Sequence, residues 1–127
     1  MLDIKKTVRK EIVPISGLFL RKLKKEVLGE DYGLSLVFIG DKLSNRLNLE
    51  TRNIDKPTNI LSFPLSKTEG EIFINLNLSK KQAPRFNKSY KDFVAYLFIH
   101  GLLHLKGFEH GSRMNSEETK LVKKFNL

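Results

Sequence analysis

The chain contains no cysteine among its 127 residues. Disulfide bonds, thiolate zinc sites and cysteine nucleophiles are therefore excluded. Tryptophan is also absent, and proline occurs only four times. A content of 40% hydrophobic and 29% charged residues is typical of globular proteins and not of disordered chains. At this length we expect residues 1–127 to form a single domain with one hydrophobic core.

Long apolar runs are also missing. The longest uncharged apolar run, Phe93 to Leu105, is interrupted by two histidines and a glycine. It is shorter than the roughly 20 residues that a membrane-spanning helix needs. The N-terminal stretch carries charges and lacks the apolar core and cleavage site of a signal peptide. These features predict a cytoplasmic protein without a membrane partner.

Acidic residues are few relative to basic ones. Lys and Arg number 23 against 14 Asp and Glu, so the formal net charge is +9 and the pI is near 9.8. This surplus favours a polyanionic partner, most simply nucleic acid. The charge alone does not choose between RNA, DNA and anionic lipid, and a basic surface that only aids solubility is an alternative.

The pattern of apolar and turn residues predicts an α+β fold, in which one small mixed sheet is covered by helices. Strands are expected over residues 2–8, 34–39, 59–63 and 71–76, with 2–8 and 59–63 at edges of the sheet. Helices are expected over residues 14–28, 41–49, 90–105 and 112–125, and polar connections over 51–58 and 80–88. The helix over 90–105 is apolar almost all round, so it should be the most buried.

The first predicted helix has an apolar and a basic side. Apolar residues recur at helical spacing, and the opposite face carries basic ones; the expected inward set is Ile15, Leu18, Phe19, Leu23 and Val27, and the outward set is Arg21, Lys22, Lys24 and Lys25. In the last predicted helix, Leu121 and Phe125 should face inward.

All three histidines fall within eleven residues. His100 and His104 are four apart, so on a helix their rings lie on one face. His110 cannot join them if the helix continues, but Gly107 can adopt the left-handed conformation that ends a helix and turns the chain back. The spacing therefore predicts that three imidazoles bind one metal ion.

Three histidine ligands leave one position of a tetrahedral metal free. This is the pattern of catalytic zinc, whereas structural zinc is closed by four protein ligands. The alternative is a set of hydrogen-bonded core histidines without metal. Burying three imidazoles in that way would cost about 1–3 kcal/mol for each polar atom left unpaired.

The spacing H-x3-H-x2-G-x2-H matches the three-ligand frame of metzincin proteases. Those enzymes carry a glutamate directly after the first histidine as the general base, and this chain has Gly101 there. Peptide hydrolysis by that mechanism is therefore not expected, which favours another substrate on the same metal frame.

Three stretches resemble one known family. HGLLHLKGFEH, from His100 to His110, is similar to the H-G-x-L-H-L-x-G-[YF]-D-H signature of the YbeY family. Leu47-Asn48, Arg52 and the run from Asp55 to Pro64 resemble its L-N-x-x-[YF]-R-x-x-D-x-P-T-[DN]-V-L-S-F-P motif, and Gly70-Glu-Ile resembles G-D-[IL].

This resemblance implies a zincin-like α+β fold and a zinc-dependent endoribonuclease that cleaves single-stranded RNA. It implies one zinc held by His100, His104 and His110, and catalytic roles for Arg52 and His104. The implied family role is 16S rRNA 3′-end maturation and ribosome quality control, with the small ribosomal subunit and its assembly factors as partners.

The chain departs from the family pattern in three places. Glu109 stands where the family usually has Asp, and Ile54 where a polar residue is common. The segment between Ile74 and Ser89 is short, which argues against a helix there.

Met114 follows His110 too soon for a metzincin Met-turn, and we expect it to pack within its helix.

The chemistry expected from these residues is metal-assisted hydrolysis of a phosphodiester, with Arg52 binding the phosphate. An ion pair between Arg52 and Asp55 is the structural alternative. The sequence does not decide how the nucleophile is activated. Glu109 could be the general base, a metal-activated water could react without a protein base, or the RNA 2′-hydroxyl could be the nucleophile.

Two other functions fit the same residues: a metal-dependent protease or amidase, and a non-catalytic ribosome-assembly factor with a structural metal. Basic residues of the first helix and of 80–88 should attract the RNA backbone.

Overall fold

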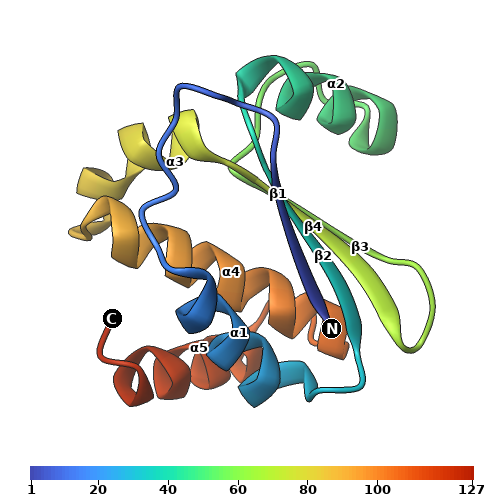
Figure 1. Ribbon diagram of the computed structural model, residues 1–127, viewed down its shortest axis with the longest axis vertical. Coiled ribbons are helices and arrows are strands. Elements are labelled where there is room, and N and C mark those ends of the chain that lie inside the picture. Colours follow the sequence, from blue (N-terminus) through green and yellow to red (C-terminus); the bar gives the residue numbers. More distant parts are fainter.

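The computed structural model describes residues 1–127 and contains a four-stranded mixed sheet and five α-helices (Figure 1). The strands are β1 (Leu2–Lys6), β2 (Gly33–Ile39), β3 (Ile60–Pro64) and β4 (Glu69–Asn75). The helices are α1 (Gly17–Leu28), α2 (Asp41–Arg52), α3 (Leu76–Gln82), α4 (Tyr90–Lys106) and α5 (Ser112–Lys124), and a short 3-10 helix, η1 (Ala83–Phe86), follows α3. The predicted α+β class is confirmed. None of the helices has the length and apolar character needed to cross a bilayer.

The sheet has the strand order β1-β2-β4-β3. Strands β1, β2 and β4 are parallel, and β3 runs antiparallel to β4, with Ser62 opposite Ile72. Both predicted edge strands therefore lie at the edges of the sheet. Strand β3 matters most for the site, because α4 packs against it and against the neighbouring β4.

The core lies between one face of the sheet and the helices α1 and α4. Alternate side chains of the two central strands are fully buried on this face: Leu34, Leu36, Phe38, Ile72 and Ile74. Helix α4 is the most buried helix, as its apolar sequence predicts, and α5 packs against it on the side away from the sheet (Figure 1). Its ends also follow the prediction, since the Ser89 hydroxyl accepts from the Asp92 N–H at 3.1 Å and Gly107 ends the helix.

Helix α1 differs from the prediction in its start and in two of its side chains. It begins at Gly17, where the Ser16 hydroxyl caps it, and not at Pro14. Leu18 is exposed, because five residues of helix place it about 140° away from the buried Leu23. Lys24 is buried, since its alkyl chain packs inward while its ammonium group donates to the Glu30 carbonyl at 3.1 Å.

Two further segments are more helical than predicted. Helix α2 continues to Arg52, three residues beyond Leu49, and Asn53 ends it in the left-handed conformation with φ 59°. The segment between Ile74 and Ser89, predicted to lack a helix, forms α3 and η1. The sequence signal there was an N-cap: the Asn75 side chain accepts from the Leu78 N–H at 3.1 Å.

The two leucines on opposite sides of α1 provide a test of this burial. We expect Leu23→Ala to lower the free energy of unfolding by about 2–5 kcal/mol, because it leaves a cavity in the core. Leu18→Ala, the control on the same helix, should change it by less than about 0.5 kcal/mol. Urea denaturation followed by circular dichroism measures both, and equal losses would contradict this packing.

Candidate metal centre

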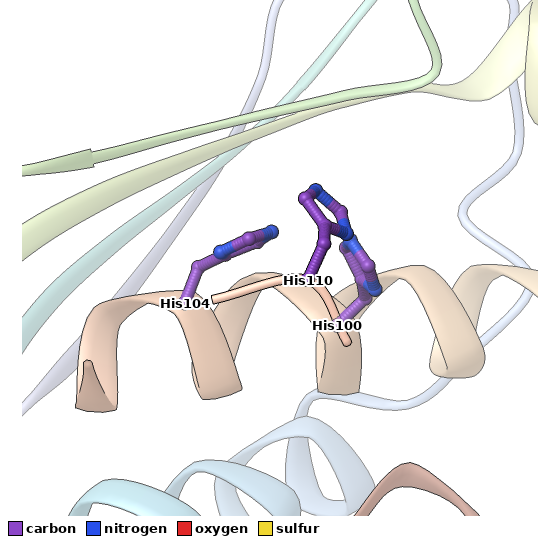
Figure 2. Close-up of side chains that lie close together, drawn as sticks. All are labelled: His100, His104 and His110. Atoms are coloured by element: carbon purple, nitrogen blue, oxygen red, sulfur yellow. The ribbon is translucent and has the colours of Figure 1, made fainter. Parts of the chain in front are cut away.

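Three imidazole rings meet beside the edge strand β3. His100 and His104 project from one side of α4, and His110 reaches them from the loop between α4 and α5 (Figure 2). The ring centroids lie 4.5–5.0 Å apart, and one potential ligand atom from each ring lies within 4.8 Å of the others. The predicted convergence of the three histidines is confirmed, and the cluster can hold a metal ion.

Gly107 makes this convergence possible, as the sequence predicts. Its φ of 109° lies in the region that favours glycine, and its N–H donates to the His104 carbonyl at 3.0 Å. The Phe108 N–H donates to the Leu103 carbonyl at 3.0 Å, so the last turn of α4 is closed. The chain then reverses, which brings His110 back over the side of α4 that carries His100 and His104.

Hydrogen bonds at Nδ1 prepare the two helical histidines for metal binding. His104 Nδ1 lies 3.1 Å from the Phe108 carbonyl oxygen, and because that oxygen can only accept, Nδ1 carries the proton. In the neutral ring Nε2 then keeps a free lone pair. His100 Nδ1 lies 3.0 Å from Oε1 of Glu118. Metal-binding histidines usually donate from their second nitrogen to a carboxylate or carbonyl in this way, so the donor set fits a metal ion.

Glu118 is the residue that sequence reasoning missed. It lies on α5, is 5% exposed, and is 18 positions away from His100. Its signal is present in the sequence, because Met114, Glu118 and Leu121 share one face of α5 at helical spacing and all three are buried. A carboxylate on the apolar face of a helix requires a buried polar partner, and here that partner is His100. Met114 packs in the core, as predicted.

The local electrostatics keep His104 and Glu118 in the forms that metal binding requires. Burial, together with the neighbouring imidazoles of His100 and His110, lowers the pKa of His104 below its ordinary value. The ring is therefore neutral at pH 7. Burial by itself raises the pKa of Glu118, but hydrogen bonds with His100 and Tyr96 outweigh it and the net pKa is lowered. Burial and the bond to Glu118 raise the pKa of Tyr96 to about 12.

The histidines line a pocket of about 430 Å³ together with Arg52, the last residue of α2. Thr58, Asn59 and residues of β3 complete its wall. The alternative of an ion pair between Arg52 and Asp55 is not observed, because Asp55 instead accepts from Asn45 at 2.9 Å and Arg52 forms no ion pair. The guanidinium group is exposed and free to bind a ligand in the pocket.

Hydrogen bonds to α2 and α3 hold the loop that forms this wall. The Ser44 hydroxyl donates to the Thr58 carbonyl at 2.6 Å and accepts from its N–H at 2.8 Å. Asn48 Nδ2 donates to the Lys56 carbonyl at 3.0 Å, and Asn59 Nδ2 donates to Gln82 Oε1 at 2.9 Å. These partly buried bonds tether the loop after Arg52 at three points.

No carboxylate lines the pocket. Glu109, one candidate for the general base, is exposed and lies in a neighbouring cavity formed by residues 106–113. It forms no hydrogen bond to a histidine, so Glu118 and not Glu109 is the carboxylate that contacts the cluster. The polar groups of the pocket are therefore all positive or neutral, which suits an anionic ligand.

Gly101 explains why the glutamate of the metzincin frame is missing. A Cβ atom at this position would lie 2.9 Å from Ser62 Oγ and 3.0 Å from the Cδ1 atoms of Ile60 and Ile72. The backbone of α4 thus contacts the sheet directly at residue 101. A side chain there would push the helix and its histidines away from β3.

Known proteins resemble this chain in sequence and in fold. Residues 3–126 match the family model described as Endoribonuclease YbeY. A Campylobacter jejuni protein of that name is 39% identical over 102 residues, covering 74% of this chain and 76% of the relative. One from Aliarcobacter butzleri is 33% identical and covers 100% and 94% of the two chains. A solution structure from Thermotoga maritima has a TM-score of 0.66 at 24% identity, over 97% of this chain and 87% of that one.

The close contact at residue 101 provides one test. We expect Gly101→Glu to lower the free energy of unfolding by at least about 2 kcal/mol, because it overpacks the contact between helix and sheet and buries a carboxylate. Gly17→Glu is the control, since a Cβ there meets only the end of the Arg21 side chain and Ile4 at 3.6 Å. Equal urea midpoints for the two variants would contradict the contact.

The buried carboxylate provides a second test. We expect Glu118→Gln to weaken Zn²⁺ binding roughly 10- to 100-fold, because a neutral amide orients and polarises His100 less well than a carboxylate. The control is Glu117→Gln, whose carboxylate contacts only Lys120 at 3.4 Å. Competition with a chromogenic chelator measures both affinities, and an unchanged affinity for Glu118→Gln would show that this contact does not support the metal site.

Proposed function

Because the chain belongs to the endoribonuclease YbeY family, we propose that it is a metal-dependent endoribonuclease that cleaves single-stranded RNA. The observation that carries the proposal is the shared pocket, in which three clustered imidazoles and one free guanidinium group face the same space without any carboxylate. A phosphodiester is the anionic substrate that such a pocket suits, whereas a neutral peptide does not need it.

The proposed metal is zinc, held by His100, His104 and His110. Three neutral nitrogen ligands with one free position are the arrangement of catalytic zinc. When bound, zinc supplies a Lewis acid that polarises a phosphoryl oxygen and acidifies a water molecule. Glu118 and the Phe108 carbonyl support this role, because they orient His100 and His104 from the opposite ring nitrogen.

Arg52 is proposed to bind the scissile phosphate. Its planar guanidinium group can donate two parallel hydrogen bonds to phosphate oxygens and stabilise the charge that grows in the transition state. The tethered loop supports this role, since Ser44 and Asn48 hold the backbone that follows Arg52. The nearby Ser62 and Thr58 provide neutral polar groups along the pocket for the sugar or phosphate.

Within the pocket the chain offers no carboxylate as a general base, and Gly101 leaves no room for one. With the three imidazoles occupied by the metal, the substrate and the solvent remain as proton acceptors. We therefore favour routes that need no protein carboxylate, with either a water molecule or the 2′-hydroxyl of the RNA as the nucleophile. His104 is the catalytic histidine in this proposal, because burial lowers its pKa and so keeps the ring neutral and able to bind the metal.

The proposed biological substrate is the precursor of 16S rRNA, cleaved at its 3′ end, with a further role in ribosome quality control. The small ribosomal subunit and its assembly factors are then the expected partners, and the cytoplasm is the expected location. The family membership supports this assignment, and the net charge of +9 favours a polyanionic partner of this kind.

One experiment separates this proposal from the other two functions. The purified protein is assayed for bound metal and then incubated with single-stranded RNA, double-stranded RNA and casein. We expect about one zinc per chain and cleavage of single-stranded RNA only. His104→Ala should lose both the metal and the cleavage, and Arg52→Glu should keep the metal and cut about 100-fold more slowly or worse.

Arg46→Glu is the matched control for Arg52→Glu, because Arg46 lies on the same helix, is exposed, and contacts only Glu50 at 3.9 Å. It should cleave RNA at nearly the original rate. Zinc-dependent cleavage of casein without cleavage of RNA would indicate the protease or amidase. Tight RNA binding without cleavage, unchanged in His110→Ala, would indicate an assembly factor with a structural metal.

A further inference from the structure

A half-exposed aromatic ring lies at the start of α4. Phe86, the last residue of η1, is 51% exposed and is the one aromatic residue among the exposed large hydrophobic residues. Its ring stacks on Phe93 with a centroid distance of 4.9 Å and an interplanar angle of 24°. Phe93 in turn stacks on Tyr96 at 6.2 Å and 21°. One face of Phe86 is therefore covered by a rigid support, and the exposed part of the ring is held in place.

This aromatic stack shares a helix face with the histidines. Phe93, His100 and His104 are seven and four residues apart, a spacing that keeps them on one side of α4. Seven residues of helix separate Phe93 from His100 by about 10 Å along the axis. Gln82 connects the two regions, because its Oε1 accepts from Asn59 in the wall of the metal pocket and it directly precedes η1.

The chain around Phe86 is strongly basic. No carboxylate occurs between Glu71 and Asp92, and five cations lie in that interval: Lys80, Lys81, Arg85, Lys88 and Lys91. None of them forms an ion pair. Lys88 instead lies over the Tyr96 ring, with Nζ 5.4 Å from its centroid. This surface thus combines an exposed ring with unpaired positive charge, as single-strand binding proteins do.

We propose that Phe86 and the basic segment 80–91 form a second RNA subsite, in which an unpaired base stacks on Phe86 while the adjoining phosphates lie near the lysines and Arg85. The subsite rests on the proposed function, and the contact between Gln82 and Asn59 places it next to the wall of the metal pocket. It also gives a reason for selecting single strands, because a base inside a duplex has no free face for Phe86.

The absence of tryptophan from the chain allows a direct test. Phe86→Trp introduces a single fluorophore at the subsite, and Leu18→Trp introduces one on α1 at a side chain that is 67% exposed. The zinc-loaded proteins are titrated with an oligouridylate of about 12 nucleotides. We expect the single strand to quench the fluorescence of the Phe86→Trp protein saturably and a duplex to quench it little. The fluorescence of the Leu18→Trp protein should change little with either. Binding of the single strand to the Phe86→Trp protein without quenching would overturn the proposal.

Affinity gives a second readout. Phe86→Leu keeps an apolar side chain on Phe93 but removes the aromatic face, so it should weaken single-strand binding by roughly tenfold or more, while Phe86→Trp restores it. Anisotropy of labelled RNA measures the affinities, and a gel confirms that the RNA stays intact. Leu18→Ala is the control, and an affinity of Phe86→Leu equal to that of the control would contradict the subsite. If the unaltered protein cuts no RNA while Phe86→Leu still weakens binding, the proposed function fails and the subsite stands.

Discussion

The direct contact between α4 and the sheet at Gly101 is the constraint on which the site depends. With no side chain at this position, the helix backbone lies within contact distance of Ser62, Ile60 and Ile72. That approach places His100 and His104 beside β3, so that the imidazoles and the strand line one pocket. A residue that serves as a catalytic base in metzincins is thus replaced by one that brings helix and sheet together.

The site is assembled from both local and distant parts of the chain. The three histidines come from one helix and the loop after it, whereas Arg52 ends α2 and Glu118 belongs to α5. Different features position these residues. The helical spacing aligns His100 with His104, hydrogen bonds hold the loop that follows Arg52, and Glu118 lies on the buried face of its helix. The pocket itself contains no carboxylate, and the buried carboxylate of Glu118 contacts His100 from behind it. Phosphate binding and the orientation of His100 are therefore assigned to different residues.

The helices and strands were predicted correctly where several sequence signals agreed. Helix α4 carries an N-cap serine, a continuous apolar run and a terminal glycine, and its bounds were predicted to within a residue. Helix α1 was predicted less well, because apolar spacing alone did not reveal that Leu18 lies outside the buried stripe or that Lys24 can be buried with its ammonium group bonded to a carbonyl. Helix α3 was missed, since seven mostly polar residues give little periodicity and the helix is stabilised by its contacts with α4 and β4.

The histidine cluster was determined by the sequence itself, because two ligands one turn apart and a glycine that reverses the chain are local features within eleven residues. Only the tertiary structure decided which groups surround it. The bond between His100 and Glu118 joins residues 18 apart, and the bond between Asn59 and Gln82 joins residues 23 apart. Such pairings depend on how α5 and α3 pack against the rest of the molecule, and helical periodicity specifies the buried face of a helix but not the partner that covers it.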